Sequence, residues 1–361
     1  ARGGSRRLTA LSIVAAAREY PGRVALIAEG RSYSYEQLAA LSKSTTLPPQ
    51  GLLRAEPTLE TALALYASLE ARTPVALVSS SLSVQDFAAL RERLDGAPVE
   101  DTALILFTSG SAGASKAVRL SASALAASAG ASAKVLGWAE EDRWLCCLPL
   151  SHIGGLSVLL RCLFARKTAV LCDGFSTSVV AEALTSQRIT QISLVPTMLW
   201  RLLEHGVVAP SHLRTTLIGG AALDEDLARR AAASGFRLRP SYGMTETASM
   251  VVCDGHPLPG VQLRFLDDAR LAIRGPMLMQ GYLPPDDSDS PLEDGWLHTT
   301  DRARFGEDGH LEILGRSDST IISGGENIRL EEVEAALRTH PRVASCLALG
   351  LPDPEWGQKL V

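Results

Sequence analysis

The chain has 361 residues, 46% of them hydrophobic, and a formal net charge of −5 at pH 7. This length and composition predict a large buried core, in several domains or one composite domain. The acidic balance, without a long basic block, argues against a nucleic-acid surface and leaves a small-molecule role open. Six irregularly spaced cysteines predict neither a disulfide framework nor a zinc site. Because we find no spanning apolar run and no secretory leader, we expect a cytoplasmic protein.

Short apolar runs alternate with helical patterns through the first two thirds of the chain. The alanine-rich stretch 121–134 is assigned to a helix rather than to a linker because it lacks proline. Strands that alternate with helices indicate an α/β fold with a largely parallel sheet covered on both faces. Strands are predicted at residues 103–107, 144–148, 168–171, 191–195 and 215–218, and further helices at 59–69, 177–186 and 197–205.

The character of the sequence changes after about Val251. Alternating residues at 262–274 predict an antiparallel hairpin, and another short strand is expected at 310–314. From Ile321 onward, a Gly-Gly turn followed by a helix and a strand indicates the start of a smaller domain. That helix is predicted at 330–339 and that strand at 344–349, whereas residues 352–361 complete no recognisable unit.

A loop of glycines and hydroxyl residues, TSGSAGASK at 108–116, directly follows the strand at 103–107. Its glycines lack the Cβ atoms that would block close approach, and Lys116 adds a positive charge. This pattern predicts a loop that holds phosphate oxygens through backbone N–H groups and hydroxyls. It is not a Walker loop, because Ala117 stands where the magnesium-binding hydroxyl would be. The alternative is a flexible surface loop.

Further segments follow this loop in a fixed order along the chain. They are PLSHIGG at 149–155, GGAA at 219–222, SYGMTET at 241–247, GWLHTTD at 295–301, and GRSD at 315–318 with SGGENI at 323–328. Together with the loop, this ordered set resembles the adenylate-forming superfamily, which includes acyl- and aryl-CoA ligases, luciferases and peptide-synthetase adenylation domains. The resemblance runs from about Ala10 to the last residue.

The resemblance implies both a fold and a reaction. We expect a large N-terminal adenylation domain over 1–317, with mostly parallel sheets flanked by helices and a small β-barrel-like region. An incomplete small α+β domain would follow over 318–361. Members of the superfamily activate a carboxylate with ATP and Mg²⁺ as an acyl-adenylate, release pyrophosphate and pass the acyl group to a thiol such as that of CoA. Adenylation is needed because a carboxylate does not react with a thiol until one of its oxygens becomes a good leaving group.

The same resemblance implies roles for individual residues around the nucleotide. Thr245 would contact the α-phosphate, and Glu246 would carry Mg²⁺. Ala112 and Ser115 depart from the usual loop motif, so we expect weaker nucleotide affinity with the chemistry retained. The phosphate loop would act through Thr108, Ser109, Gly110, Ser111, Gly113 and Lys116. The adenine and ribose would be held by Gly219, Gly220, Ala221, Tyr242, Gly243, Asp301 and Arg316, with an interdomain salt bridge as the alternative for Arg316.

The smaller domain carries the remaining implied positions. Asp318 falls at the family's hinge, about which that domain rotates between an adenylating and a thioester-forming pose. Gly324 and Gly325 would let the backbone approach the pantetheine arm of CoA, with a simple turn as the alternative. The family's adenylation lysine lies beyond Val361, and Lys359 is too early to be that residue. We therefore expect the chain as given to be weak in the first half-reaction.

The expected acyl pocket narrows the choice of carboxylic acid. Residues 150–153 lack the aspartate with which peptide-synthetase domains bind an α-amino group, so amino-acid activation is disfavoured. His152 resembles the gate or wall residue of aryl- and acyl-CoA ligases. The resemblance makes it a candidate catalytic residue, as it does Lys116. A histidine that caps the following helix is the alternative. The stretches 152–161 and 193–203 resemble o-succinylbenzoate–CoA ligases of menaquinone and phylloquinone biosynthesis.

The acid that those ligases use carries a second carboxylate, which needs a cation in the acyl pocket. We predict that Arg161 supplies this cation, because an arginine within the apolar run 158–163 is costly to bury unpaired. The alternative places Arg161 on the outer face of its helix. Ser193 and Gly220 complete the predicted acyl site with His152.

Other interpretations stay open at this point. The chain could be another aryl- or acyl-CoA ligase, an enzyme that loads a carrier protein, or a catalytically silent nucleotide-binding relative. For the ligase, the expected partners are the small-molecule substrates ATP, an aromatic carboxylate and CoA, without nucleic acid or membrane, and a homodimer stays open.

Overall fold

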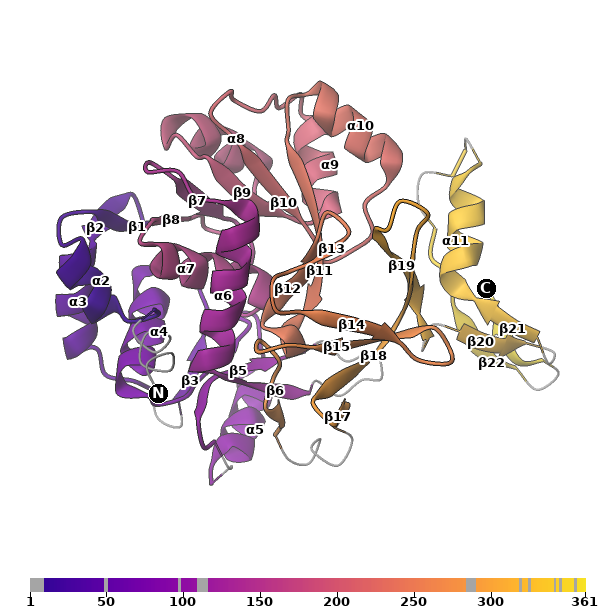
Figure 1. Cartoon of the computed structure of the whole chain (residues 1–361), viewed down its shortest axis with the longest axis horizontal. Coiled ribbons are helices and arrows are strands. Elements are labelled where there is room, and N and C mark those ends of the chain that lie inside the picture. Colours follow the sequence, from indigo (N-terminus) through magenta and orange to yellow (C-terminus); the bar gives the residue numbers. More distant parts are fainter. Residues whose placement is uncertain are drawn as a thin grey trace. The chain divides into compact units, whose positions relative to one another are not determined.

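The computed structural model describes residues 10–48, 51–96, 99–108, 116–283, 290–317, 320–323, 326–340, 342–343, 346–353 and 356–361. The chain divides into two compact units (Figure 1). The first unit comprises Ala1–Val261 with Gly275–Ser290, and the second comprises Gln262–Arg274 with Pro291–Val361. The predicted hairpin at 262–274 is thus grouped with the later strands, while the predicted domain boundary at 317/318 stays a prediction.

A nine-stranded sheet organises the first unit, in the order β13-β12-β11-β10-β9-β7-β8-β1-β2 (Figure 1). Neighbouring strands from β11 across to β1 are parallel, whereas β2, β12 and β13 are added antiparallel at the edges. The predicted parallel sheet is therefore confirmed for its centre. The strands are β1 (Val24–Ala28), β2 (Arg31–Ser34), β7 (Arg143–Cys146), β8 (Thr168–Leu171), β9 (Gln191–Leu194), β10 (Thr215–Ile218), β11 (Leu238–Met244), β12 (Ser249–Cys253) and β13 (His256–Pro257).

A second sheet in the same unit has five strands, in the order β16-β6-β5-β4-β3. Strands β3, β4 and β5 are parallel, and β6 and β16 continue the sheet antiparallel. The predicted phosphate loop connects β5 to β6, so its two ends are fixed by neighbouring strands. The strands are β3 (Leu52–Arg54), β4 (Val75–Val78), β5 (Thr102–Phe107), β6 (Ala117–Ser121) and β16 (Gly281–Tyr282).

Helices cover these sheets, and most of them begin at a residue whose side chain caps the free backbone N–H groups. Such caps are Ser12, Ser34, Thr58, Ser83, Ser121 and Asp224. The alanine-rich stretch predicted as a helix is α6, which packs against α7. The helices are α2 (Ile13–Glu19), α3 (Tyr35–Ser44), α4 (Leu59–Ala71), α5 (Val84–Leu94), α6 (Ala122–Leu136), α7 (Ile153–Ala165), α8 (Thr177–Ser186), α9 (Pro196–Glu204) and α10 (Glu225–Ala233).

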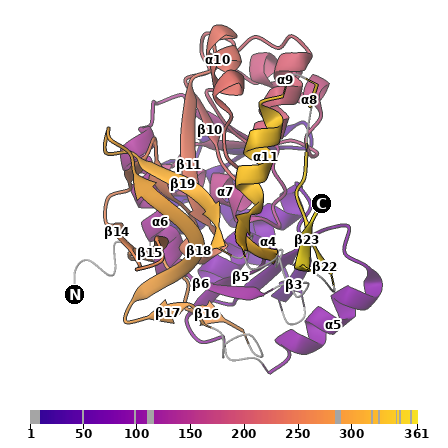
Figure 2. The ribbon, with the colours of Figure 1, turned by 90° about the vertical axis from the view of Figure 1, so that its right-hand side faces the viewer.

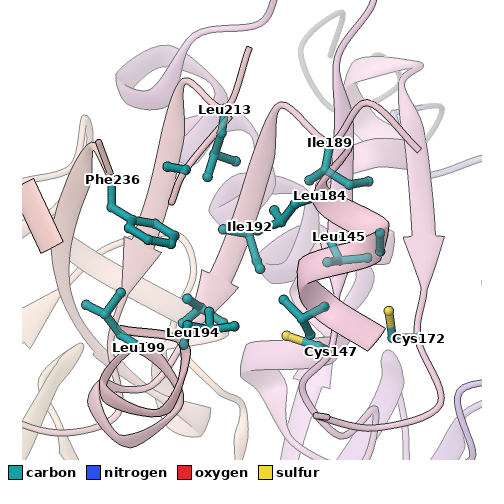
Figure 3. Close-up of a cluster of buried hydrophobic side chains, with 14 of the residues drawn as sticks. Leu145, Cys147, Cys172, Leu184, Ile189, Ile192, Leu194, Leu199, Leu213 and Phe236 are labelled. Atoms are coloured by element: carbon teal, nitrogen blue, oxygen red, sulfur yellow. The ribbon is translucent and has the colours of Figure 1, made fainter. Parts of the chain in front are cut away.

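Apolar side chains of the parallel strands meet those of the covering helices in one large cluster (Figure 3). Ile192 and Leu194 of β9 lie in it with Leu199 of α9, and all three are fully buried. Strands β8, β9 and β10 are buried at every position, as is typical of a parallel sheet with both faces covered. This burial explains why the sequence shows them as continuous apolar runs.

One buried carboxylate, that of Asp142, joins the amino-terminal ends of β7, β9 and β10. The Asp142 side chain, directly before β7, has no exposed surface. It accepts hydrogen bonds from Thr190 Oγ1 at 2.8 Å and Gln191 Nε2 at 3.0 Å, where β9 begins. It also accepts one from Arg214 Nε at 2.8 Å, directly before β10, and one from the Ala139 amide at 2.7 Å. Both oxygens of the buried Asp142 carboxylate therefore accept hydrogen bonds from the protein.

The second unit contains two antiparallel sheets. The first lies in the part of the chain where the small β-barrel-like region is predicted. In it, β14 and β15 form the expected hairpin, and β18 pairs with β15, β17 and β19. The second has the order β21-β20-β23-β22, and α11 lies against β21 (Figure 1). Figure 2 shows α11 with strands β22 and β23 of this sheet from another side. The elements are β14 (Gln262–Phe265), β15 (Arg270–Arg274), β17 (Leu292–Glu293), β18 (Trp296–Phe305), β19 (Leu311–Arg316), β20 (Thr320–Ser323), β21 (Glu326–Arg329), α11 (Leu330–Arg338), β22 (Gly350–Asp353) and β23 (Gly357–Leu360).

The end of the second unit corrects the sequence-based assignment. Residues 346–349 of the strand predicted at 344–349 lie outside any strand, and β22 begins at Gly350. The last residues form a hairpin, because β22 pairs antiparallel with β23 and Leu349 and Val361 exchange backbone hydrogen bonds of 2.9 Å. Proline, aspartate and glycine in these strands hid the hairpin from a pattern that looks for apolar alternation.

The cysteines and helices also bear on the sequence-based expectations. All six cysteines are free thiols, as the irregular spacing predicts. No helix within the described ranges is both long and apolar enough to cross a bilayer.

The Asp142 cluster predicts how stability depends on pH. Burial alone would raise the pKa of Asp142, but hydrogen bonds from Arg214, the Ala139 amide and Thr190 outweigh it and hold that pKa below its usual value. Asp142→Asn should lower the free energy of unfolding at pH 7 by about 3 kcal/mol, because it breaks a buried charge pair. Because the folded pKa is lowered, this contribution is present above the unfolded pKa of about 4 and is lost as the pH falls through the folded pKa.

Urea unfolding of the wild type and the variant at pH 7 and in acid measures this effect. The matched control is Asp226→Asn, which removes an exposed carboxylate paired with Arg229 and should cost less than about 1 kcal/mol. If both variants lowered the free energy of unfolding by the same amount at pH 7, the stabilising role assigned to the buried Asp142 carboxylate would be contradicted.

Candidate functional site

Three parallel strands, β9, β10 and β11, end at one edge of the large sheet, and predicted site residues lie within or directly after each of them. Gly219 and Gly220 come directly after β10, between Val195 after β9 and Ser241 within β11. A Cβ at Gly219 would lie 2.7 Å from Ser241 Oγ, so a side chain there would displace the hydroxyl that donates to the Ile218 carbonyl oxygen at 2.9 Å. Gly220 is exposed, which leaves a backbone surface against which a ring can lie. The carboxyl ends of parallel strands are where α/β folds bind ligands.

Strand β11 carries the predicted adenine contact into a tight turn. Tyr242 is paired with Val252 of β12, and the register shifts between Tyr242 and Gly243. A Cβ at Gly243 would lie 2.2 Å from the Ser249 carbonyl oxygen, so a side chain at this position would collide with the neighbouring strand. The chain then enters a short 3₁₀ turn at Thr245–Thr247, which presents Thr245 and Glu246.

The structure brings Glu246 and Lys116 together through a residue that the sequence analysis did not single out. Tyr282 Oη donates a hydrogen bond of 3.0 Å to Glu246 Oε1. Lys116 Nζ lies 4.9 Å from the centroid of the same tyrosine ring. The Met279 amide donates to the Glu246 carbonyl oxygen at 2.8 Å, which fixes the backbone of the turn. One aromatic side chain thus contacts a carboxylate through its hydroxyl and an ammonium group through its ring face.

Glu246 is suited to a magnesium ion that is shared with a nucleotide. Its carboxylate is half-buried, and Oε1 accepts the Tyr282 hydroxyl while Oε2 has no hydrogen-bond partner among the described residues. No group of three His, Cys, Asp or Glu side chains that could hold a metal occurs in the described part of the chain. Mg²⁺ commonly binds through one or two carboxylates plus substrate phosphates rather than in a cage of protein ligands. The residues present therefore fit the implied ion.

The base of the predicted phosphate loop is closed by backbone hydrogen bonding. The Thr108 amide donates to the Lys116 carbonyl oxygen at 2.9 Å, directly beyond the pairing of Phe107 with Ala117. Both Thr108 and Lys116 are half-buried. The other predicted loop residues, Ser109, Gly110, Ser111 and Gly113, lie outside the described residues.

Arg161 is buried inside the first unit and does not lie on the outer face of its helix. It is 2% exposed in the middle of α7. One guanidinium nitrogen donates to Ser249 Oγ at 3.0 Å, and the guanidinium carbon lies 5.3 Å from the Trp144 ring centroid. Trp144 Nε1 in turn donates to Ser193 Oγ at 3.0 Å, so the predicted acyl residues Arg161 and Ser193 belong to one buried polar cluster.

The charge of Arg161 is incompletely compensated. Among the described residues no carboxylate forms an ion pair with it, and its buried Nε has no hydrogen-bond partner. Burial lowers the pKa of Arg161 to about 10, so the group stays charged at neutral pH. Its partner Ser249 has a φ of +103°, a strained value for a residue with a side chain. This environment is compatible with the predicted contact between Arg161 and a substrate carboxylate, which stays a prediction.

His152 is exposed at the start of α7. It occupies the N-cap position, but its side chain makes no capping hydrogen bond. The alternative that this histidine caps the helix is therefore wrong. The side chain is available for a role as a pocket wall.

The remaining predicted positions fall in the second unit. Asp301 of β18 and Arg316 of β19 are direct cross-strand partners. The Asp301 amide donates to Thr299 Oγ1 at 3.1 Å, and Arg316 is exposed. The predicted hinge residue Asp318 and the predicted CoA contacts Gly324 and Gly325 lie outside the described residues.

Sequence reasoning missed three residues that the structure places among the predicted ones: Trp144, Ser249 and Tyr282. Trp144 lies within a predicted strand, where an aromatic residue is ordinarily read as core. Tyr282 follows a glycine directly before a proline-rich loop, where only its isolation as an aromatic residue could have marked it. Nothing in the local pattern links Ser249 to Arg161, which is 88 positions away in the chain.

Comparison with known proteins identifies the family of this chain. The family model described as AMP-binding enzyme matches residues 50–283. The 2-succinylbenzoate–CoA ligase of Bacillus pumilus is 37% identical over 282 residues, which cover 72% of this chain and 58% of that protein. The chain therefore spans less than two thirds of the length of that curated relative.

Solved structures show the same fold over nearly the whole chain. The o-succinylbenzoate CoA synthetase of Bacillus subtilis with its acyl-adenylate intermediate is 28% identical, with a TM-score of 0.84 over 96% of this chain and 86% of that one. The same enzyme in complex with ATP and magnesium ion is 28% identical, with a TM-score of 0.84 over 96% of this chain and 88% of that one. Because the family model covers well over half of the chain, this chain belongs to the AMP-binding enzyme family.

Proposed function

We propose that the protein activates o-succinylbenzoate with ATP and Mg²⁺ as an acyl-adenylate and transfers the acyl group to CoA. Membership of the AMP-binding enzymes supports the adenylating chemistry. The names of the relatives, which are 2-succinylbenzoate–CoA ligases and o-succinylbenzoate CoA synthetases, support the choice of acid and acceptor. The activity of these relatives is a proposal for this protein, because the matched part of the chain covers 58% of the Bacillus pumilus ligase.

The observation that carries the choice of acid is the buried, incompletely compensated guanidinium of Arg161. A charge that is 2% exposed and lacks a carboxylate partner among the described residues is costly unless an anion joins it. The acid named for the relatives has a second carboxylate beside the one that reacts. Arg161 would bind that second group, with Ser193 and the backbone at Gly220 along the same strand ends and His152 as a pocket wall.

The nucleotide would be held by the motifs at the strand ends and after β5. Tyr242 would stack on the adenine beside Gly219, Gly220, Ala221 and Gly243, and Asp301 would accept hydrogen bonds from the ribose hydroxyls with Arg316 nearby. Thr245 would donate to the α-phosphate. Lys116 and the loop from Thr108 through Ser109, Gly110, Ser111 and Gly113 would stabilise the negative charge that grows on the leaving pyrophosphate.

The remaining roles belong to the ion and to the smaller domain. Mg²⁺, when bound, would neutralise charge on the phosphate oxygens, and Glu246 would hold it through the free Oε2. The same proposal includes a domain boundary at 317/318 and a hinge at Asp318. It also includes contacts with CoA at Gly324 and Gly325. One site would then serve both half-reactions.

The decisive assay is CoA-thioester formation by the full-length protein with ATP, Mg²⁺ and CoA, detected by product mass. We expect a product with o-succinylbenzoate and none with benzoate or a medium-chain fatty acid, because only the first offers a second carboxylate to Arg161. Product from another acid would overturn the substrate but keep the adenylating chemistry. Turnover only with an added carrier protein, or nucleotide binding without pyrophosphate release, would instead favour the two other interpretations.

Arg161→Leu tests the predicted acid contact. The variant should raise the KM for o-succinylbenzoate about 100-fold, because a hydrogen-bonded charged pair contributes about 2–3 kcal/mol, and each 1.4 kcal/mol corresponds to a factor of ten. The KM for ATP should stay within about two-fold of the wild type. Steady-state kinetics with each substrate varied in turn measure both constants.

The matched control is Arg166→Leu at the end of the same helix. Arg166 is 8% exposed and its Nε is paired with Glu19 Oε2 at 2.9 Å, so its loss should lower stability while leaving the KM for the acid unchanged. If Arg161→Leu left the KM for the acid unchanged as well, the assignment of Arg161 would be wrong.

A further inference from the structure

Tyr282 belongs to a segment that reaches the phosphate motifs from far along the chain. Its strand, β16, pairs with β6, and Tyr282 is the register partner of Val118. The next residue extends this pairing, since the Leu283 amide donates to the Ala117 carbonyl oxygen at 2.8 Å. The Tyr282 backbone is thus fixed to the two residues that follow Lys116. Tyr282 is 6% exposed, so it is held in a packed environment.

From this position one side chain contacts both charged groups of the nucleotide motifs. The Oη atom donates to Glu246 Oε1 at 3.0 Å, and the ring face lies 4.9 Å from Lys116 Nζ. Among the residues that the structure describes, no ion pair joins Lys116 to Glu246. Both charged groups therefore contact the same tyrosine while neither neutralises the other.

The two contacts have distinct physical effects. A hydroxyl that donates to one carboxylate oxygen fixes the side-chain torsion of Glu246 and leaves the other oxygen for a cation. The face of an aromatic ring attracts an ammonium group without neutralising it, so Lys116 keeps its full charge for an anion. Without the tyrosine, the ammonium and the carboxylate could neutralise each other and both would be lost to a ligand.

We propose that Tyr282 is a positioning residue that orients Glu246 toward Mg²⁺ and keeps Lys116 and Glu246 apart until the metal–nucleotide complex binds. The proposal rests on the function proposed above and assigns to it a residue outside the recognised motifs. Tyr282 itself acts through Glu246 and Lys116 rather than on the reacting atoms.

The test compares ATP binding with and without magnesium, by isothermal titration calorimetry of the full-length protein, once in Mg²⁺ and once in EDTA. Tyr282→Phe keeps the ring and removes the hydroxyl. It should weaken ATP binding about tenfold in Mg²⁺, since the loss of a residue that orients a metal ligand costs about 10–100-fold in metal affinity. In EDTA the variant should bind ATP as the wild type does, because Lys116 still has the ring beneath it.

Tyr282→Leu removes the ring as well. This second variant should also bind ATP more weakly in EDTA, because Lys116 is then free to pair with Glu246. Thermal melting of each variant shows whether it is folded, and the comparison between Mg²⁺ and EDTA remains valid for a folded protein of lower stability.

The matched control is Tyr35→Phe in α3. Tyr35 is 1% exposed and its Oη donates to two backbone carbonyl oxygens, of Cys162 at 3.2 Å and Lys167 at 2.8 Å. Losing this buried hydroxyl should lower the melting temperature without changing ATP affinity in either buffer. The control thus separates a loss of packing from a loss of metal positioning.

Two results would overturn the inference alone: Tyr282→Phe binding ATP like the wild type in Mg²⁺, or losing the same factor in Mg²⁺ and in EDTA. A wild-type protein that binds no ATP in either buffer would overturn the proposed function and this inference with it. ATP binding by the wild type with the expected loss in Mg²⁺ only would support the role of Tyr282, whichever acid proves to be the substrate.

Discussion

The buried carboxylate of Asp142 is the constraint on which the arrangement of the large sheet depends. It accepts hydrogen bonds from residues at the starts of β9 and β10 and from the amide of Ala139, while it directly precedes β7. A charge without exposed surface is stable only when its hydrogen bonds are satisfied, so these strand ends cannot shift independently. Because the amino ends of β9 and β10 are fixed, their opposite ends, which carry Ser193 and Gly219, keep their register.

At the carboxyl ends of the parallel strands, backbone conformation shapes the predicted site as much as the side chains do. Gly219 and Gly243 stand where any Cβ would collide with Ser241 or Ser249. Ala248 and Ser249 follow with positive φ values of 50° and 103°. The Ala248 carbonyl accepts from Ser128 Oγ and the Ser249 carbonyl from Thr247 Oγ1, both at 2.7 Å. Strain of this kind persists only where the surroundings over-determine it, and here it places Ser249 against Arg161.

Much of the first unit follows from its sequence because local pattern and tertiary environment agree. Strands β8 and β10 have the predicted bounds, and α8 does as well, since continuous apolar runs and a 3.6-residue period suit a sheet buried on both faces. The terminal hairpin was not predicted, because β22 and β23 contain few β-formers and depend on pairing with each other and with β20. Strands this short are specified by their partners.

The sequence by itself determined the family, the order of the motifs and the identity of the charged residues, because glycine, hydroxyl and charge patterns are local and chemically explicit. Only the tertiary structure decided that Arg161 is buried without a carboxylate partner among the described residues, and that Tyr282 contacts both Lys116 and Glu246. Lys116 and Tyr282 are 166 positions apart, and they meet because β16 pairs with β6. Such contacts arise from strand pairing over long loops, which local periodicity does not encode.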